Sequence, residues 1–195
     1  VVAELEKQGY EIVRVGLRRD GSWDPQEVLD ASDPALTALV SLIWANNETG
    51  AVSPVQDLSE ELRTRRIPFH LDAVQCFGRI PVDLARTPVG MVSLSAHKFG
   101  APKGIGALFV RQGTPWKRWM QGGNQERARR GGTVNAPGAA GMSAAIRRME
   151  SVDPCAMLRA RDELEAAIGQ AVPGSRVVGI GSSRLPNTSC VCIPG

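Results

Sequence analysis

The sequence predicts an α/β protein built on a mainly parallel, doubly wound sheet. Strand-like and helical segments alternate through the first half of the chain. Residues 37–45 form a continuous run rich in apolar and β-branched side chains, which is typical of a strand buried on both faces. Polar residues follow the ends of several predicted strands, where the ligand crevice of such a sheet lies. These observations predict both the fold class and the edge of the sheet that carries function.

The first elements can be placed in order along the chain. Residues 2–9 have the pattern of the last turns of an amphipathic helix, which ends at Gly9. Strands are predicted at residues 11–17, 37–45, 68–72, 90–95 and 104–111.

A helix is predicted after the second of these strands. It would begin at Pro54 and end near Arg66. Ser53 would cap it, and Gln56 would complete a capping box. Its apolar stripe would consist of Val55, Leu58 and Leu62.

The pattern changes after Pro137. Two helices are predicted there, the second beginning at Asp153-Pro154, and a short strand is expected at 176–178. We therefore expect a large domain at 1–136, connecting helices at 137–168 and the start of a smaller α+β domain at 169–195. Because the chain opens within a helix-like segment and stops after a strand-like one, we expect both ends of the complete protein to be missing.

The composition is that of a globular protein with a substantial core. Of the 195 residues, 43% are hydrophobic and 22% are charged, which argues against disorder. No apolar run could span a bilayer and no signal-peptide pattern opens the chain, so we expect a soluble, cytoplasmic protein. The four cysteines and two histidines lack zinc-site spacing. We expect reduced thiols, most of them buried.

The basic residues raise the possibility of a nucleic-acid partner. The net charge is +3, and Arg127, Arg129 and Arg130 form the densest basic run. Against this, the chain has 20 acidic residues and only 5% aromatic residues, and no recognition helix or stacking platform lies nearby. Nucleic-acid binding is therefore the weaker interpretation, and a local anion site is favoured.

Three polar groups stand at the ends of predicted strands. They are residues 46–48, Asp72 with Gln75, and residues 95–98. We expect them to meet in one crevice. A lysine amine can hold an aldehyde cofactor, a carboxylate can keep a pyridine nitrogen protonated, and serine and histidine can bind a phosphate. The combination is typical of a pyridoxal phosphate site.

Each of these residues also has a structural interpretation. Lys98 could be a solvated surface lysine, as most lysines are. Asp72 could act only as a helix cap, with Gln75 as an exposed first-turn residue. His97 could be a core histidine bonded to the backbone, and Asn47 could be a turn former. Taken singly the residues leave these alternatives open, and their combination favours the cofactor site.

Six segments carry a family resemblance. They are Ala45-Asn-Asn-Glu-Thr-Gly50, Asp72-Ala-Val-Gln75, Ser95-Ala-His-Lys98, Gly104-Ile-Gly-Ala-Leu108, Gly122-Gly-Asn-Gln-Glu-Arg127 and Arg130-Gly-Gly-Thr133. In this order and spacing, the chain resembles the cysteine desulfurases and selenocysteine lyases, which are class V, fold-type I pyridoxal phosphate enzymes. Any one segment would be a weak signal, whereas six in order are a strong one. The resemblance covers nearly the whole chain.

The resemblance implies roles for the residues that bind the cofactor ring. Lys98 would hold the cofactor covalently and is the implied catalytic residue. Asp72 would pair with the pyridinium nitrogen, and Gln75 would hydrogen-bond the phenolic oxygen. Asn47 would lie by that same oxygen and the substrate carboxylate.

Further roles concern the phosphate and the partner subunit. Ser95 and His97 would bind the phosphate, and Thr133 would reach the phosphate of the opposite subunit in a homodimer. No residue is implied as a metal ligand.

The implied reaction is the removal of sulfur from L-cysteine, which gives alanine and an enzyme persulfide. A sulfur-acceptor protein would receive the sulfur, for iron-sulfur cluster assembly or other sulfur-transfer biosynthesis. The reacting cysteine would lie outside this chain, and Cys76, Cys190 and Cys192 would be structural. The alternatives are a selenocysteine lyase, another class V aminotransferase or lyase, or an inactive fragment that acts only as a binding piece.

Overall fold

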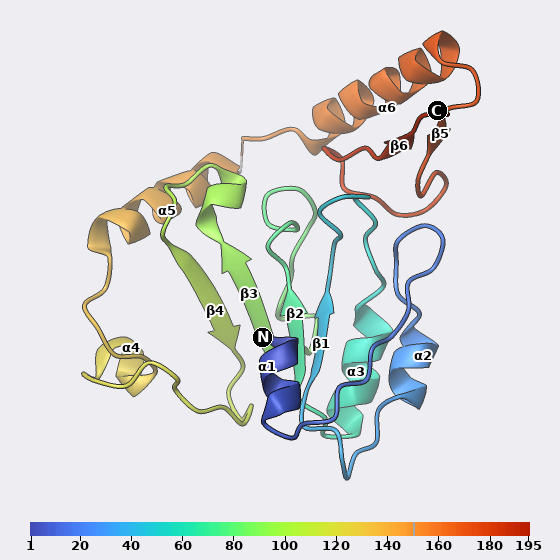
Figure 1. Ribbon diagram of the computed structural model, residues 1–195. Coiled ribbons are helices and arrows are strands. Elements are labelled where there is room, and N and C mark those ends of the chain that lie inside the picture. Colours follow the sequence, from blue (N-terminus) through green and yellow to red (C-terminus); the bar gives the residue numbers. More distant parts are fainter. Residues whose placement is uncertain (150) are drawn as a thin grey trace.

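The computed structural model describes residues 1–149 and 151–195. Its centre is a four-stranded sheet in the order β1 (Val40–Ile43), β2 (Phe69–Asp72), β3 (Met91–Ser95) and β4 (Gly106–Val110). The first three strands are parallel, and β4 is antiparallel to β3. The carboxyl ends of the parallel strands therefore lie at one edge, at the top of Figure 1. The predicted mainly parallel sheet is confirmed.

The direction of β4 follows from the short connection before it. A parallel connection needs a crossover of about a dozen residues or more, usually a helix. Residues 96–105 hold only the 3-10 turn η1 (Ala96–Phe99), and Gly100 after it has a left-handed φ of 91°. The chain therefore turns back along β3. Gly106 lies so close to β3 that a Cβ there would be 2.6 Å from the Leu94 carbonyl oxygen.

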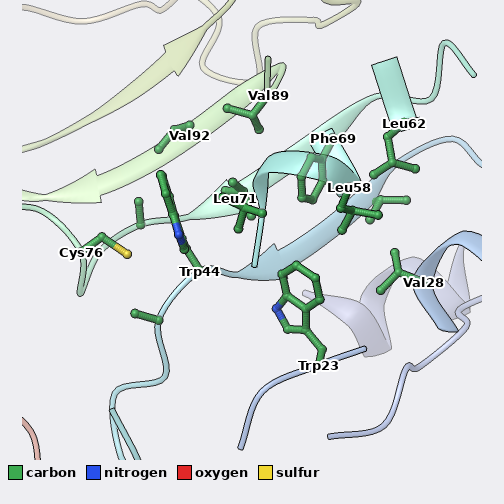
Figure 2. Packing of buried hydrophobic residues seen from close by; sticks show 14 of the residues in the cluster. Trp23, Val28, Trp44, Leu58, Leu62, Phe69, Leu71, Cys76, Val89 and Val92 are labelled. Atoms are coloured by element: carbon green, nitrogen blue, oxygen red, sulfur yellow. The ribbon is translucent and has the colours of Figure 1, made fainter. Parts of the chain in front are cut away.

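The core lies on one face of this sheet. Burial alternates along β2, where Phe69 and Leu71 are buried and their neighbours are half-buried. The helices α2 (Pro25–Asp30) and α3 (Gln56–Thr64) supply side chains to this core, so the apolar stripe predicted for α3 is largely confirmed. Figure 2 shows these side chains together with others of the cluster, including Trp23, Val28, Trp44, Leu58, Leu62, Val89 and Val92.

The opposite face of the sheet is more open and carries several polar side chains. Ser41 and Ile43 of β1 are exposed. His70 lies between two serines, with Nδ1 2.8 Å from Ser41 Oγ and Nε2 3.2 Å from Ser93 Oγ. The expectation that residues 37–45 are buried on both faces is therefore wrong for this chain, because the core forms on one face alone.

Two local predictions in the first part of the chain are wrong. Residues 11–17 form no strand, and only Leu17 makes an isolated bridge, to Trp23. Ser53 does not cap α3, because the helix begins only at Gln56 and Val55 occupies the capping position without a side-chain bond. The Ser53 backbone N–H donates to the Trp44 carbonyl at 2.9 Å. The Gln56 amide donates instead to the Arg86 carbonyl at 2.6 Å. Ser53 and Gln56 thus bond to distant segments, whereas residues 11–17 have no partner strand in the described sheet.

The helices at both ends match the predictions closely. α1 (Val2–Lys7) is followed by Gly9 at a φ of 88°. After the short α4 (Gln125–Ala128) come α5 (Ala136–Met149) and α6 (Pro154–Ala171). Asp153 caps α6, and its Oδ1 accepts from the Cys155 N–H at 2.9 Å. No helix in the described residues is long and apolar enough to cross a membrane.

The last part of the chain forms a small unit beyond the top of the sheet. β5 (Arg176–Val177) pairs antiparallel with β6 (Val191–Cys192), so the short predicted strand is confirmed. Figure 1 shows α6, β5 and β6 grouped together beyond the carboxyl ends of β1 and β2. We call α6, β5, β6 and the residues between them the C-terminal unit.

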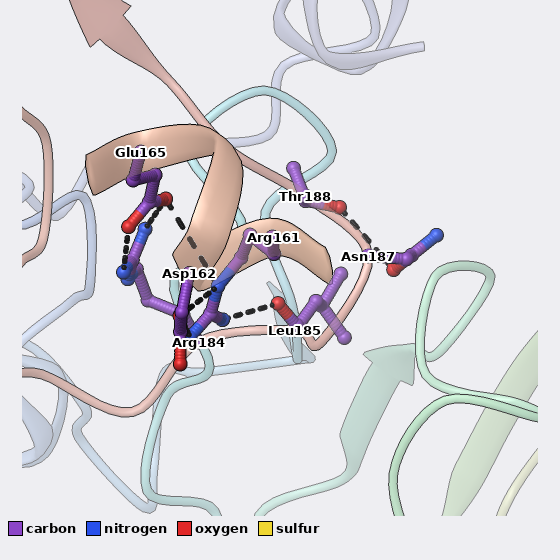
Figure 3. A network of polar contacts seen from close by, with 7 residues as sticks. All are labelled: Arg161, Asp162, Glu165, Arg184, Leu185, Asn187 and Thr188. Atoms are coloured by element: carbon purple, nitrogen blue, oxygen red, sulfur yellow. Dashed lines mark hydrogen bonds and ion pairs between the residues drawn. The ribbon is translucent and has the colours of Figure 1, made fainter. Parts of the chain in front are cut away.

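Arg184 and Leu185 join the C-terminal unit to the edge of the sheet. Leu185 is fully buried, and its N–H donates to the Gly50 carbonyl at 2.8 Å. Arg184 donates to both carboxylate oxygens of Glu165, at 2.7 and 2.9 Å. Arg161 donates to the Leu185 carbonyl at 2.8 Å, as Figure 3 shows. The C-terminal unit thereby supports the loop that follows β1.

Candidate functional site

Asp72 is the last residue of β2, at the carboxyl edge of the sheet. Its side chain is half-buried, and Oδ1 accepts from the Val74 N–H at 2.9 Å. This bond caps the turn that follows, so the capping interpretation accounts for one carboxylate oxygen. Oδ2 makes no hydrogen bond to any residue that the structure describes, and it remains available to a ligand.

The turn after Asp72 carries Gln75 and an arginine that the sequence analysis did not single out. The Arg79 Nη1 donates to the Gln75 carbonyl at 2.8 Å and to its side-chain Oε1 at 2.9 Å. The Nη2 donates to the Lys98 carbonyl at 2.9 Å. Arg79 therefore connects two of the predicted groups directly. The available signal was its place four residues after Gln75, a spacing at which side chains meet on a helical turn.

Lys98 lies on η1, directly after β3. This turn is anchored by Ala96, which is fully buried and donates its N–H to the Ile105 carbonyl at 3.1 Å. Ser95 Oγ and His97 Nδ1 are 2.9 Å apart. His97 is exposed and bonds to this side chain, so it is not a core histidine bonded to the backbone. The Lys98 side chain is half-buried, and none of the ion pairs between described residues includes it.

Asn47 lies on the loop that follows β1, and β1 is the strand that pairs with β2. The neighbouring Asn46 forms the turn, because its Oδ1 accepts from the N–H groups of Glu48 and Thr49 at 2.8 and 3.0 Å. Asn47 is exposed. Asn46, rather than Asn47, therefore forms the turn. The Asn47 amide makes no hydrogen bond to another described residue.

Thr133 is the one predicted site residue that the fold keeps apart from the others. It lies on the exposed stretch between α4 and α5. Figure 1 shows α4 near the opposite end of the sheet from η1. Gly131 closes the loop before it by donating to the Met120 carbonyl at 2.8 Å, and a Cβ on Gly131 would clash with the Gln121 carbonyl oxygen. Within one chain, Thr133 is not brought to the end of the sheet that carries Asp72 and Lys98.

The cysteines differ in exposure more than the sequence predicted. Cys76 is fully buried beside the candidate site. Burial, and then the charge of Asp72, raise the pKa of its thiol to about 12. The thiol therefore stays protonated at neutral pH, as suits a structural residue. The expectation that most of the cysteines are buried is wrong, because Cys155 and Cys192 are exposed and Cys190 is half-buried.

The family follows from comparison with known proteins. Residues 1–194 match the class-V aminotransferase family, and the chain belongs to it. A cysteine desulfurase of Cereibacter sphaeroides is 46% identical over 188 residues, which are 96% of this chain and 48% of that protein. The chain spans about half the length of the curated relatives it matches.

Solved structures agree with this assignment. A NifS-like protein superposes over 100% of this chain and 54% of its own, with a TM-score of 0.90 and 32% identity. The structure of SspA in complex with cysteine covers the same shares, with a TM-score of 0.88 and 31% identity. The fold is therefore the fold-type I α/β fold of the NifS-like proteins.

The residues at this edge of the sheet fit pyridoxal phosphate. Asp72 Oδ2, Gln75 Nε2 and Lys98 Nζ form no hydrogen bond or ion pair with another described residue. They supply an acid, a donor and an amine, which suit the pyridine nitrogen, the phenolic oxygen and the aldehyde of that cofactor. Ser95 and His97 lie within three residues of Lys98 in the sequence, their side chains are 2.9 Å apart, and both can donate to a phosphate.

Proposed function

We propose that the complete protein is a pyridoxal phosphate-dependent cysteine desulfurase that converts L-cysteine to L-alanine and releases the sulfur to a thiol. The observation that carries the proposal is the link through Arg79, which joins the Asp72–Gln75 turn to Lys98 at neighbouring strand ends. The family supports it, as does the cysteine desulfurase of Cereibacter sphaeroides. The complex of SspA with cysteine supports the choice of substrate.

The cofactor-binding residues would divide the work as follows. Lys98 Nζ would hold the cofactor and, once freed by the substrate amine, would move the proton of the substrate α-carbon. Asp72 Oδ2 would keep the pyridine nitrogen protonated. Gln75 and Asn47 would donate to the phenolic oxygen. When bound, pyridoxal phosphate supplies an electron sink for the substrate α-carbon.

Phosphate binding would involve both subunits of a homodimer. Ser95 and His97 would bind the phosphate from their own subunit. Thr133 is exposed and distant from this edge of the sheet, which supports a role at the phosphate of a second copy. We further propose residues 1–136 as the large domain, 137–168 as connecting helices and 169–195 as the start of the small domain.

The family resemblance implies that the cysteine which takes up the sulfur lies outside residues 1–195, and the chemistry of Cys76 excludes that residue. The Cys76 thiol is buried and has a pKa of about 12, so it cannot supply a thiolate at neutral pH. We propose that the sulfur passes from the missing cysteine to an acceptor protein in the cytoplasm, for iron-sulfur cluster assembly or a related pathway.

The central test compares two lysines of the full-length protein. Lys98→Ala should abolish the visible absorbance that pyridoxal phosphate acquires on the protein and the formation of alanine from L-cysteine in the presence of a thiol reductant. Lys103→Ala is the matched control, because Lys103 is exposed on the loop before β4, and it should behave like the wild type. A coloured, active Lys98→Ala protein would contradict the proposal. A keto acid in place of alanine would identify an aminotransferase instead.

A further inference from the structure

Arg79 occupies an unusual position for a half-buried arginine. Its three hydrogen bonds all go to neutral oxygen atoms, two in Gln75 and one in Lys98. None of the ion pairs found among residues 1–149 and 151–195 includes Arg79. A guanidinium in this setting is held by geometry rather than by a counter-charge, because its planar fork of donors can reach several acceptors at once.

The bond to Gln75 Oε1 decides which end of the amide faces a ligand. A glutamine amide has one acceptor oxygen and one NH₂ donor group, and its orientation is set by the surrounding hydrogen bonds. Arg79 has only donors, so it must take the oxygen. The Gln75 Nε2 is then the free end of the amide, and it can only donate. A donor is the group that an anionic oxygen requires.

The bond to the Lys98 carbonyl connects this donor to the predicted cofactor lysine. Gln75 and Lys98 follow neighbouring strands and are 23 positions apart in the sequence. One guanidinium spans both. Phe77 and Phe99, which follow Gln75 and Lys98 along the chain, also pack against each other, with ring centroids 5.4 Å apart. The turn after β2 and η1 are therefore held as one unit.

We propose that Arg79 is a positioning residue that presents Gln75 as a hydrogen-bond donor to the phenolic oxygen of bound pyridoxal phosphate and fixes the spacing of that donor from the Lys98 amine. This inference rests on the proposed function, since it takes pyridoxal phosphate as the ligand. It assigns Arg79 no contact with the cofactor itself.

The test is a double-mutant cycle on cofactor affinity in the full-length protein. Gln75→Met and Arg79→Met should each weaken the binding of pyridoxal phosphate to the apo protein about tenfold, the usual effect of one lost bond to a charged acceptor. If Arg79 acts through Gln75, adding Arg79→Met to Gln75→Met should weaken binding by at most about threefold more. Fully additive effects, about 100-fold in the double variant, would overturn the proposal.

Arg111 provides the matched control. It is also half-buried and also donates to three neutral oxygens, which in this case are the backbone carbonyls of Leu84, Thr87 and Val89. Those residues lie before β3, away from Lys98. Arg111→Met should lower the thermal unfolding midpoint and leave cofactor affinity unchanged. An equal loss of affinity in Arg79→Met and Arg111→Met would mean that Arg79 is merely structural.

A conservative variant keeps the test decisive if Arg79→Met fails to fold. Arg79→Lys retains the charge, but a single ammonium lacks the fork that reaches both Gln75 and Lys98. It should fold and bind pyridoxal phosphate about three- to tenfold more weakly than the wild type. Wild-type affinity in Arg79→Lys would overturn the inference. A wild-type protein that does not bind pyridoxal phosphate would instead contradict the proposed function.

Discussion

Arg79 and Arg184 are two clamps built from the same side chain in different electrostatic settings. Arg184 pairs with the carboxylate of Glu165, and these two side chains are only 6% and 9% exposed. Arg79 contacts neutral oxygens of Gln75 and Lys98. A buried, paired charge is costly to break and holds two parts of a chain in place. Arg184 therefore holds the C-terminal unit together, whereas Arg79 joins two segments of the candidate site.

The largest expected effect comes from breaking the clamp in the C-terminal unit. Arg184→Ala leaves Glu165 buried without its main partner and should lower the free energy of unfolding by about 3–5 kcal/mol. Thermal or urea unfolding of the full-length protein measures this loss. The exposed Arg176 lies in the same unit, and Arg176→Ala should change stability by less than about 0.5 kcal/mol. Equal losses from the two substitutions would show that the Glu165 pair contributes little.

Asp72→Asn separates capping from cofactor chemistry on the turn that Arg79 joins to Lys98. Asparagine caps a turn as well as aspartate does, so the bond to the Val74 N–H and the stability should be retained. Asparagine lacks the charge that would hold the pyridine nitrogen protonated, so alanine formation should fall about 100-fold or more. Pyridoxal phosphate should still bind. Near-normal turnover with unchanged unfolding would mean that Asp72 is only a cap.

The smallest expected effect is the pH dependence of the Arg184 clamp. The hydrogen bonds from Arg184 hold the pKa of Glu165 below its ordinary value of 4.5, with the charge of Arg161 acting in the same direction. Because the unfolded chain then binds the proton more tightly, this contribution to stability is complete above about pH 4.5 and is lost as the pH falls through the folded-state pKa.

Glu165→Gln checks this sign, because glutamine does not titrate. The difference in thermal midpoint between the wild type and Glu165→Gln should be constant near neutral pH and should shrink as the pH falls below about 4.5. A difference that stays constant down to pH values where carboxylates are protonated would contradict the assignment. The titration of groups far from the pair is common to both proteins and cancels in the comparison.

The sequence predicted those elements whose signals are local. The Asp153 cap of α6 could be predicted because the capping bond joins residues only two positions apart in the sequence. The strands at 68–72 and 90–95 were placed to within about a residue, because their apolar character and the polar residues that follow them are visible in the sequence. The polar groups at Asp72, Ser95 and Lys98 were found for the same reason.

Long-range pairing decided what the local patterns could not. Ser53 stands in a good capping sequence, but α3 begins only at Gln56, and the Ser53 N–H pairs with the Trp44 carbonyl of a distant segment. Residues 11–17 have the composition of a strand, yet they find no partner strand in the described sheet. Leu185 lies far along the chain in a turn-rich segment, and it became part of the central core. These outcomes depend on which segments meet, and closure of long loops leaves no local trace in sequence.

The candidate site shows the same division. By itself, the sequence determined which chemical groups stand at the strand ends, because a run of residue types and its spacing are properties of the chain alone. Only the tertiary structure showed that Asn46 rather than Asn47 forms the turn, that Thr133 lies apart, and that Arg79 bonds both Gln75 and Lys98. The physical reason is that a hydrogen bond is directional and short, so its partner is known only when the strands that carry the two groups have been placed side by side.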